Sequence, residues 1–268
     1  MRSIFVTVLA LFVLSAGSSA LASQQAKPQP QGQQQGQPQK PTTPAQPGEV
    51  TPEQIFALFN ANKFDEGFAE GAKYIEKHPD DVQVRTQLAI VASSQAQRGD
   101  AKYVAQGKQY ASQAIQAIEA DKKSLEFDDT TWPTFKTQWL PKLYQGNGVL
   151  AYVTSDKAAA RQNIEKAAGL DPGDPVNPML LGTFANDEYQ ELAKKFNADK
   201  NEAVLKQAMA KMDEVIDWYA RSVAAADGKP GYEALQKEIT AQLEQYYSFR
   251  HNNSTTGLKE LIEKYKKK

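Results

Sequence analysis

Residues 144–172 read YQGNGVLAYVTSDKAAARQNIEKAAGLDP, and the predicted fold depends most on these residues. Apolar side chains recur at helical spacing up to Val153, a polar break follows at positions 154–156, and a second run of the same period begins at Ala159. Pro172 ends the second run, because proline cannot continue a helix and restricts the residue before it. The stretch therefore predicts two short helices folded back on each other. Small residues leave room for the two helix axes to approach closely, namely Gly148, Ala151, Ala160 and Ala167.

The order of large, small and helix-breaking residues in this stretch resembles a known repeat. A large residue stands near the start, an Asn-Gly pair follows, alanines occupy two fixed points and Asp-Pro ends the unit. These residues are Tyr144, Asn147, Gly148, Ala160, Ala167, Asp171 and Pro172. The stretch is similar to a tetratricopeptide (TPR) repeat, and residues 62–81, NKFDEGFAEGAKYIEKHPDD, resemble the second half of another unit. The array is degenerate, because Pro79 and Pro172 are not separated by a whole number of units of about 34 residues.

The resemblance implies an all-α fold, a right-handed stack of about five antiparallel helical hairpins that forms a TPR-like solenoid. Helical spacing predicts further hairpins from the residues themselves, pairing 51–62 with 64–77, 81–97 with 101–121, and 177–197 with 199–226. A last hairpin joins the helix at 232–247 to a final helix from about Thr255. The final helix is amphipathic on one side only, so we expect it to pack on the helix at 232–247 and cap the array.

The N-terminal residues predict an export signal and a tether. Arg2 precedes an uncharged apolar run at 4–14, and a small-residue segment ends in Ala20-Leu21-Ala22, the pattern of a signal peptide cleaved after Ala22. The apolar run is shorter than the about 20 residues that span a bilayer, although an uncleaved anchor is the alternative. Residues 23–49 are rich in Gln, Pro and Gly and predict a disordered tether or spacer, followed by the helical domain at 50–268. We therefore expect a periplasmic or extracellular protein with no stable membrane insertion of the mature chain.

Composition argues against several functional classes. The chain has a formal net charge of −1 and contains no cysteine, so it offers neither the basic face that nucleic acids require nor a disulfide. Its two histidines have ordinary structural explanations, His78 at a helix end and His251 in a polar loop. No metal, phosphate-loop or nucleophile motif is present. We expect no enzymatic activity, no cofactor and no metal site.

The resemblance implies that the first helix of each hairpin lines a concave groove that binds another protein or peptide. Carried over residue by residue, the groove positions are Phe56, Phe59 and Asn60 in the first unit, Gln83, Thr86 and Ile90 in the second, and Gln145, Val149 and Tyr152 in the third. Some TPR proteins clamp a terminal carboxylate with Lys and Asn at such positions, and this sequence departs from that pattern. The expected function is a non-enzymatic protein–protein interaction or scaffold module in the cell envelope or outside the cell.

An aromatic insert at 128–140 carries the alternative. Trp132, Phe135 and Trp139 follow at i, i+3 and i+7, which favours a stripe buried on extra turns that lead into the third hairpin. The same residues would otherwise form a binding patch for a small ligand or glycan. Whether Trp132 and Trp139 line an open pocket decides between these two interpretations.

Overall fold

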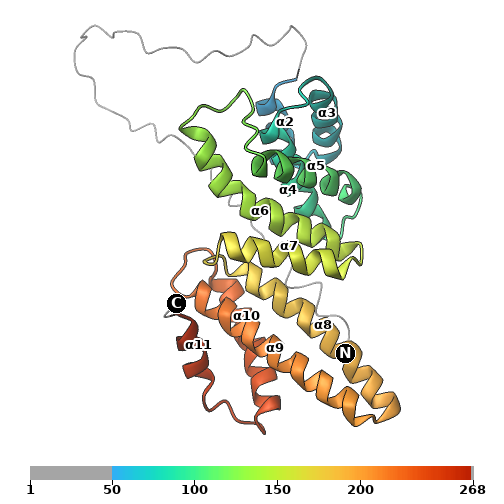
Figure 1. Ribbon diagram of the computed structural model, residues 1–268, viewed down its shortest axis with the longest axis vertical. Helices are drawn as coiled ribbons and strands as arrows, with labels where there is room; N and C mark the ends of the chain where they lie inside the picture. The colour runs from blue at the N-terminus through green and yellow to red at the C-terminus, as the bar shows by residue number, and fades with distance from the viewer. Residues whose placement is uncertain (1–49, 267–268) are drawn as a thin grey trace, which may run out of the picture. The chain divides into compact units, whose positions relative to one another are not determined.

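The protein is described here by a computed structural model over residues 50–266, and the predicted signal peptide and tether lie outside the described residues. These residues form ten α-helices and contain no strand, which confirms the all-α expectation (Figure 1). The described chain divides into two compact units, 50–74 and 75–266. Sequential helices largely pack as pairs, as expected for helical hairpins.

The first unit contains α2 (Pro52–Asn60) and most of α3 (Phe64–Lys77). Thr51 and Gln54 form a capping box, in which the Thr51 hydroxyl accepts from the Gln54 N–H at 3.4 Å and Gln54 Oε1 accepts from the Thr51 N–H at 2.9 Å. The Phe59 ring meets Phe68 edge-on, with 5.4 Å between the ring centroids. It also lies against Gly67, where an added Cβ would be 2.4 Å from Phe59 Cε1. The first helix pair is therefore closely packed around Phe59.

The second unit begins with two such pairs, α4 (Val82–Gln97) with α5 (Val104–Glu119) and α6 (Thr131–Val153) with α7 (Lys157–Leu170). Helix α6 also packs on both α4 and α5, so the second pair lies directly on the first. The aromatic insert and the first half of the TPR-like stretch form one continuous helix, α6, with Pro141 inside it. This confirms the interpretation of the insert as extra turns that lead into the third hairpin.

The rest of the second unit is organised around one long helix. It contains α8 (Val176–Asp199), α9 (Glu202–Ala226), α10 (Glu233–Arg250) and α11 (Leu258–Lys266), and α9 packs on each of the other three. The prediction that the final helix packs mainly on the helix at 232–247 is wrong, because α11 packs on α9. The Tyr265 hydroxyl donates to Asp217 of α9, and the Arg221 guanidinium lies over the Tyr265 ring at 4.5 Å.

One glycine lies at the close contact within each of four helix pairs, α2–α3, α4–α5, α6–α7 and α8–α9. A Cβ added to Gly148 would lie 2.6 Å from the Ile164 Cδ1 atom of α7, closer than side chains tolerate, and the same holds at three other crossings. The predicted close approach at Gly148 is therefore confirmed. These contacts are Gly67 with Phe59, Gly107 with Ala92, Gly148 with Ile164, and Gly182 with Tyr219.

A continuous apolar core joins α6 to α11, and its most deeply buried side chains include Ile164, Leu181, Met212, Val215, Ile239 and Leu243. None of the helices between residues 50 and 266 is both long enough and apolar enough to cross a bilayer.

Candidate interaction surface

Four aromatic side chains from α6, α8 and α10 form a surface that we call the aromatic strip: Tyr152, Tyr189, Tyr246 and Phe249. The ring of Tyr152 on α6 stacks on Phe184 of α8, with 4.7 Å between the ring centroids. On α8, the ring of Tyr189 meets Tyr246 of α10 edge-on, at 6.2 Å. Phe249 follows Tyr246 at i+3 on the same side of α10 and is 64% exposed. The strip therefore links three helices that are far apart in the sequence.

Hydrogen bonds to α8 hold the tyrosines of the strip in place. The Tyr152 hydroxyl donates to Asp187, and the Tyr246 hydroxyl donates to Asn186 Oδ1. Tyr152, Tyr189 and Tyr246 are half-buried against the core, so each ring retains an outer edge. A tyrosine with a fixed hydroxyl and a partly open ring offers apolar contact area at little entropic cost.

The electrostatic surroundings keep these tyrosines neutral. Burial raises the pKa of Tyr152, and its hydrogen bond to Asp187 raises that pKa further. Burial likewise raises the pKa of Tyr246. Beside the strip, Lys157 Nζ pairs with Glu191 Oε1 at 2.7 Å, and the pair lowers the pKa of the Glu191 carboxyl. The tyrosines can therefore act as contact surfaces and hydrogen-bonding groups, and they carry no charge at neutral pH.

The predicted groove residues lie at very different depths. Tyr152 belongs to the aromatic strip, whereas Gln145 donates through Nε2 to Asp174 Oδ2 and Asn177 Oδ1, both at 2.9 Å, inside the second unit. Asn177 Nδ2 is buried and has no hydrogen-bond partner among residues 50–266. The predicted residues divide into the exposed Asn60, the half-buried Phe56, Gln83, Ile90 and Tyr152, and the buried Phe59, Thr86, Gln145 and Val149. The groove itself stays a prediction.

The other members of the strip were not among the predicted site residues. The periodicity of α10 places Leu235, Ile239 and Leu243 in the core, and both Tyr246 at i+3 and Tyr247 at i+4 from Leu243 fit the next core position. In the structure Tyr247 takes that position, and Tyr246 turns towards α8. Two adjacent tyrosines near the end of α10, followed by Phe249, were the available signal.

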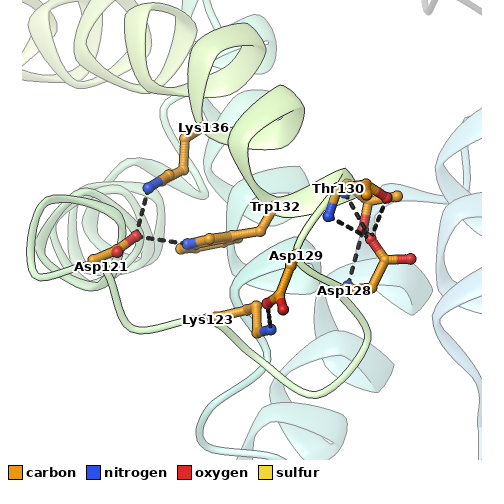
Figure 2. Close-up of polar contacts among 8 residues, drawn as sticks. Asp121, Lys123, Asp128, Asp129, Thr130, Trp132 and Lys136 are labelled. Carbon is orange, nitrogen blue, oxygen red and sulfur yellow. Dashed lines mark hydrogen bonds and ion pairs between the residues drawn. The ribbon is translucent and has the colours of Figure 1, made fainter.

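The two tryptophans of the aromatic insert do not form an open pair, because Trp132 is buried and Trp139 is half-buried. Trp132 is 4% exposed and stacks on the buried Phe135 with 5.8 Å between the ring centroids. Its Nε1 donates to Asp121 Oδ1 at 2.8 Å, and Figure 2 shows Lys136 on the same carboxylate. The bonds from Lys136 and Trp132 lower the pKa of Asp121. Trp139 is half-buried, with Lys142 Nζ 4.9 Å from its ring centroid. The expected burial is confirmed for Trp132 and Phe135, and the ligand interpretation loses its main support.

The acidic residues around this insert form structural contacts. Figure 2 shows the Asp128 carboxylate beside Thr130, and its Oδ1 atom accepts from the N–H groups of Thr130 and Thr131 at 2.9 and 2.7 Å. Hydrogen bonds from both threonine hydroxyls contribute as well, and together these bonds lower the pKa of Asp128. Asp129 pairs with Lys123 across the loop. Across residues 50–266, no three side chains of the metal-ligating types come together as a metal site.

The first unit has a surface hollow of about 460 Å³. Val50, Gln54, Ala57, Leu58, Lys63 and Glu70 line it. The hollow contains none of the aromatic residues on which the ligand interpretation depended.

Comparisons of the chain with protein-family models, with curated proteins and with solved structures gave no match. What the structure establishes is the fold class, a described region of ten helices packed largely as sequential pairs.

Proposed function

We propose that this protein is a non-enzymatic interaction module that binds a partner protein through the aromatic strip. In this proposal the helix pairs form a TPR-like array, and α6, α8 and α10 are the first helices of successive pairs. The strip then lies on the side that TPR proteins use for binding. The predicted export signal would place this activity in the cell envelope or outside the cell.

The observation that carries the proposal is that aromatic side chains of α6 and α10 both contact α8, Tyr152 at Phe184 and Tyr246 at Tyr189. Single exposed apolar side chains are common on protein surfaces and indicate nothing by themselves. Here the exposed Phe249 lies one turn beyond Tyr246, and the hydroxyls of Tyr152 and Tyr246 are bonded to α8. Tyrosine and phenylalanine are enriched in protein interfaces, where they form the buried centre of the contact.

Sequence resemblance and packing add independent support. The TPR-like stretch at 144–172 coincides with the α6–α7 pair, and its Gly148 forms the close helix contact that the resemblance implies.

The test compares partner capture by the full chain and by two variants. Phe249→Asp puts a charge on the exposed end of the strip, and Leu125→Asp makes the same change at a side chain that is 97% exposed on the loop between α5 and α6. Both positions lie outside the core, so both variants should melt like the wild type. From an envelope extract, the wild type and Leu125→Asp should capture the same proteins.

Capture of those proteins by Phe249→Asp should fall by about tenfold or more, as expected when a charge enters an apolar contact. Equal capture by all three proteins would rule out the strip as the binding surface. Loss of capture by Leu125→Asp alone would move the site to the loop between α5 and α6.

A further inference from the structure

Four prolines recur at every third position just before the described residues. They are Pro38, Pro41, Pro44 and Pro47, in the sequence PQKPTTPAQP. A polyproline II helix has three residues per turn and rises about 3.1 Å per residue, so prolines with this period lie on one face at intervals of about 9.3 Å. The segment thus has the sequence pattern of a polyproline II ligand.

The aromatic strip offers the kind of surface that such a segment binds. Its side chains come from helices that touch through their side chains, Tyr152 with Phe184 between α6 and α8, and Tyr189 with Tyr246 between α8 and α10. Proline-rich segments bind surfaces lined by aromatic rings, because a polyproline II helix is already ordered before it binds.

Polar side chains beside the strip offer hydrogen bonds and charge to such a ligand. A polyproline II backbone makes no internal hydrogen bonds, so its carbonyls need external donors. Gln242 lies one turn before Tyr246 on the same side of α10, and Gln190 is exposed on α8, where its Nε2 is 3.4 Å from Asn186 Oδ1. One turn before Gln242, Glu238 gives this side of α10 a negative end, and Lys40 is the one charged residue of the segment.

We propose that the aromatic strip of one copy binds residues 38–47 of a second copy as a polyproline II helix. This inference rests on the proposed function, in that it names a ligand for the same surface. Each copy carries both the ligand and the surface, and the two are different parts of the chain. Such a contact is heterologous, so it need not close and extends into longer chains as the concentration rises. The protein would thereby occupy its own binding surface at high concentration and release it on dilution.

Two complementary variants of the full chain test this by sedimentation velocity. The first replaces all four prolines with alanine and leaves the strip intact. The second is Phe249→Asp, which leaves the proline segment intact. Over about 10–500 µM, the range that weak contacts require, the wild-type average mass should rise with concentration while each variant alone stays monomeric. An equimolar mixture of the two variants should form a 1:1 dimer that grows no further, because only one functional pair of surfaces remains.

Leu125→Asp is the control variant, and three results would contradict the inference. Leu125→Asp should self-associate like the wild type, and circular dichroism should show equal helix content in all variants. A wild type that stays monomeric over the whole range would overturn the inference. A proline variant that associates like the wild type would overturn it too, while the capture experiment with Phe249→Asp would still decide the proposed function. If the two variants fail to dimerise in the mixture, the proline segment of one copy does not bind the aromatic strip of another.

Discussion

Gly148 shows how a single residue fixes the distance between two helices. A Cβ at this position would lie 2.6 and 2.8 Å from two carbons of Ile164 and 3.1 Å from the Ala160 carbonyl oxygen. Gly148→Leu should therefore force α6 and α7 apart and lower the free energy of unfolding by about 1–3 kcal/mol. Urea denaturation followed by circular dichroism measures this loss.

Gly169 on α7 provides the matched control, because an added Cβ there meets no atom within 4 Å. Gly169→Leu should leave stability unchanged or raise it by up to about 1 kcal/mol, since leucine favours a helix more than glycine does. Equal stability of Gly148→Leu and the wild type would show that the pair α6–α7 does not depend on this contact.

The Glu126 carboxyl gives a second prediction at the scale of one residue. Its Oε1 atom accepts from the Ser124 hydroxyl at 2.7 Å and from the Gln83 N–H at 3.4 Å. Burial, and then the nearby Asp81, raise the pKa of Glu126. A raised pKa means that the folded protein holds this proton more tightly than the unfolded chain does. The charged carboxylate therefore destabilises the fold at neutral pH, and the cost disappears as the pH falls through the folded pKa towards the ordinary value of about 4.3.

Glu126→Gln keeps the accepting oxygen and removes the charge. The variant should be more stable than the wild type at about pH 7, and the difference should shrink as the pH approaches about 4.3. Arg85 lies near Asp81, donating to its carbonyl oxygen, and it remains charged throughout, so it does not reverse this trend. A difference in unfolding free energy that is the same at both pH values would contradict the assignment.

At the scale of helices, local patterns predicted the elements well. The capping box at Thr51 and the cap at Asp81, which accepts from the Val84 N–H at 2.8 Å, both mark helix starts that are visible in the sequence. These signals are local, since each depends on residues within one turn. The contact of Gly148 was predictable as well, through the resemblance of its stretch to a TPR repeat.

The neighbours of each helix were harder to predict, for a physical reason. An amphipathic pattern shows that one face of a helix is buried, but it does not show which other helix covers that face. Helix α11 therefore packs on α9 rather than on α10. The sequence pattern does not show which helices meet, and this also explains the outcome at the candidate site. The aromatic strip depends on how α6, α8 and α10 meet, so Tyr152 was the one member of the strip that was predicted.

Helix α11 should still act as a cap, with α9 as its support. Leu258 is buried, and Leu261, Ile262 and Tyr265 pack against the core of the second unit. Truncation at Ser254 would expose the apolar surface beneath them, so the shortened protein should aggregate, as light scattering would show. Tyr265→Phe is the control, because it removes only the hydroxyl that donates to Asp217 and should remain soluble. A truncated protein that stays monomeric with the same helix content per residue would favour a role for α11 in partner docking.

At the scale of the whole molecule, stability and self-association should be separable. Residues 23–48 are rich in Gln, Pro and Gly and offer little apolar surface to bury, so their deletion should leave the melting temperature unchanged in dilute solution. The same deletion removes the proline segment and should abolish the rise of mass with concentration. A contact between copies stabilises the folded state only in proportion to its occupancy, by about 0.4 kcal/mol when the protein concentration equals the dissociation constant.

A small difference in melting temperature between the full chain and the deletion variant should therefore appear only as the concentration rises. Scanning calorimetry of both proteins over a range of concentrations measures it directly. A large difference in dilute solution would contradict this prediction, because a contact between copies is then unoccupied and only docking within one copy could stabilise the fold. The concentration dependence thus separates a ligand shared between molecules from a segment that belongs to the fold.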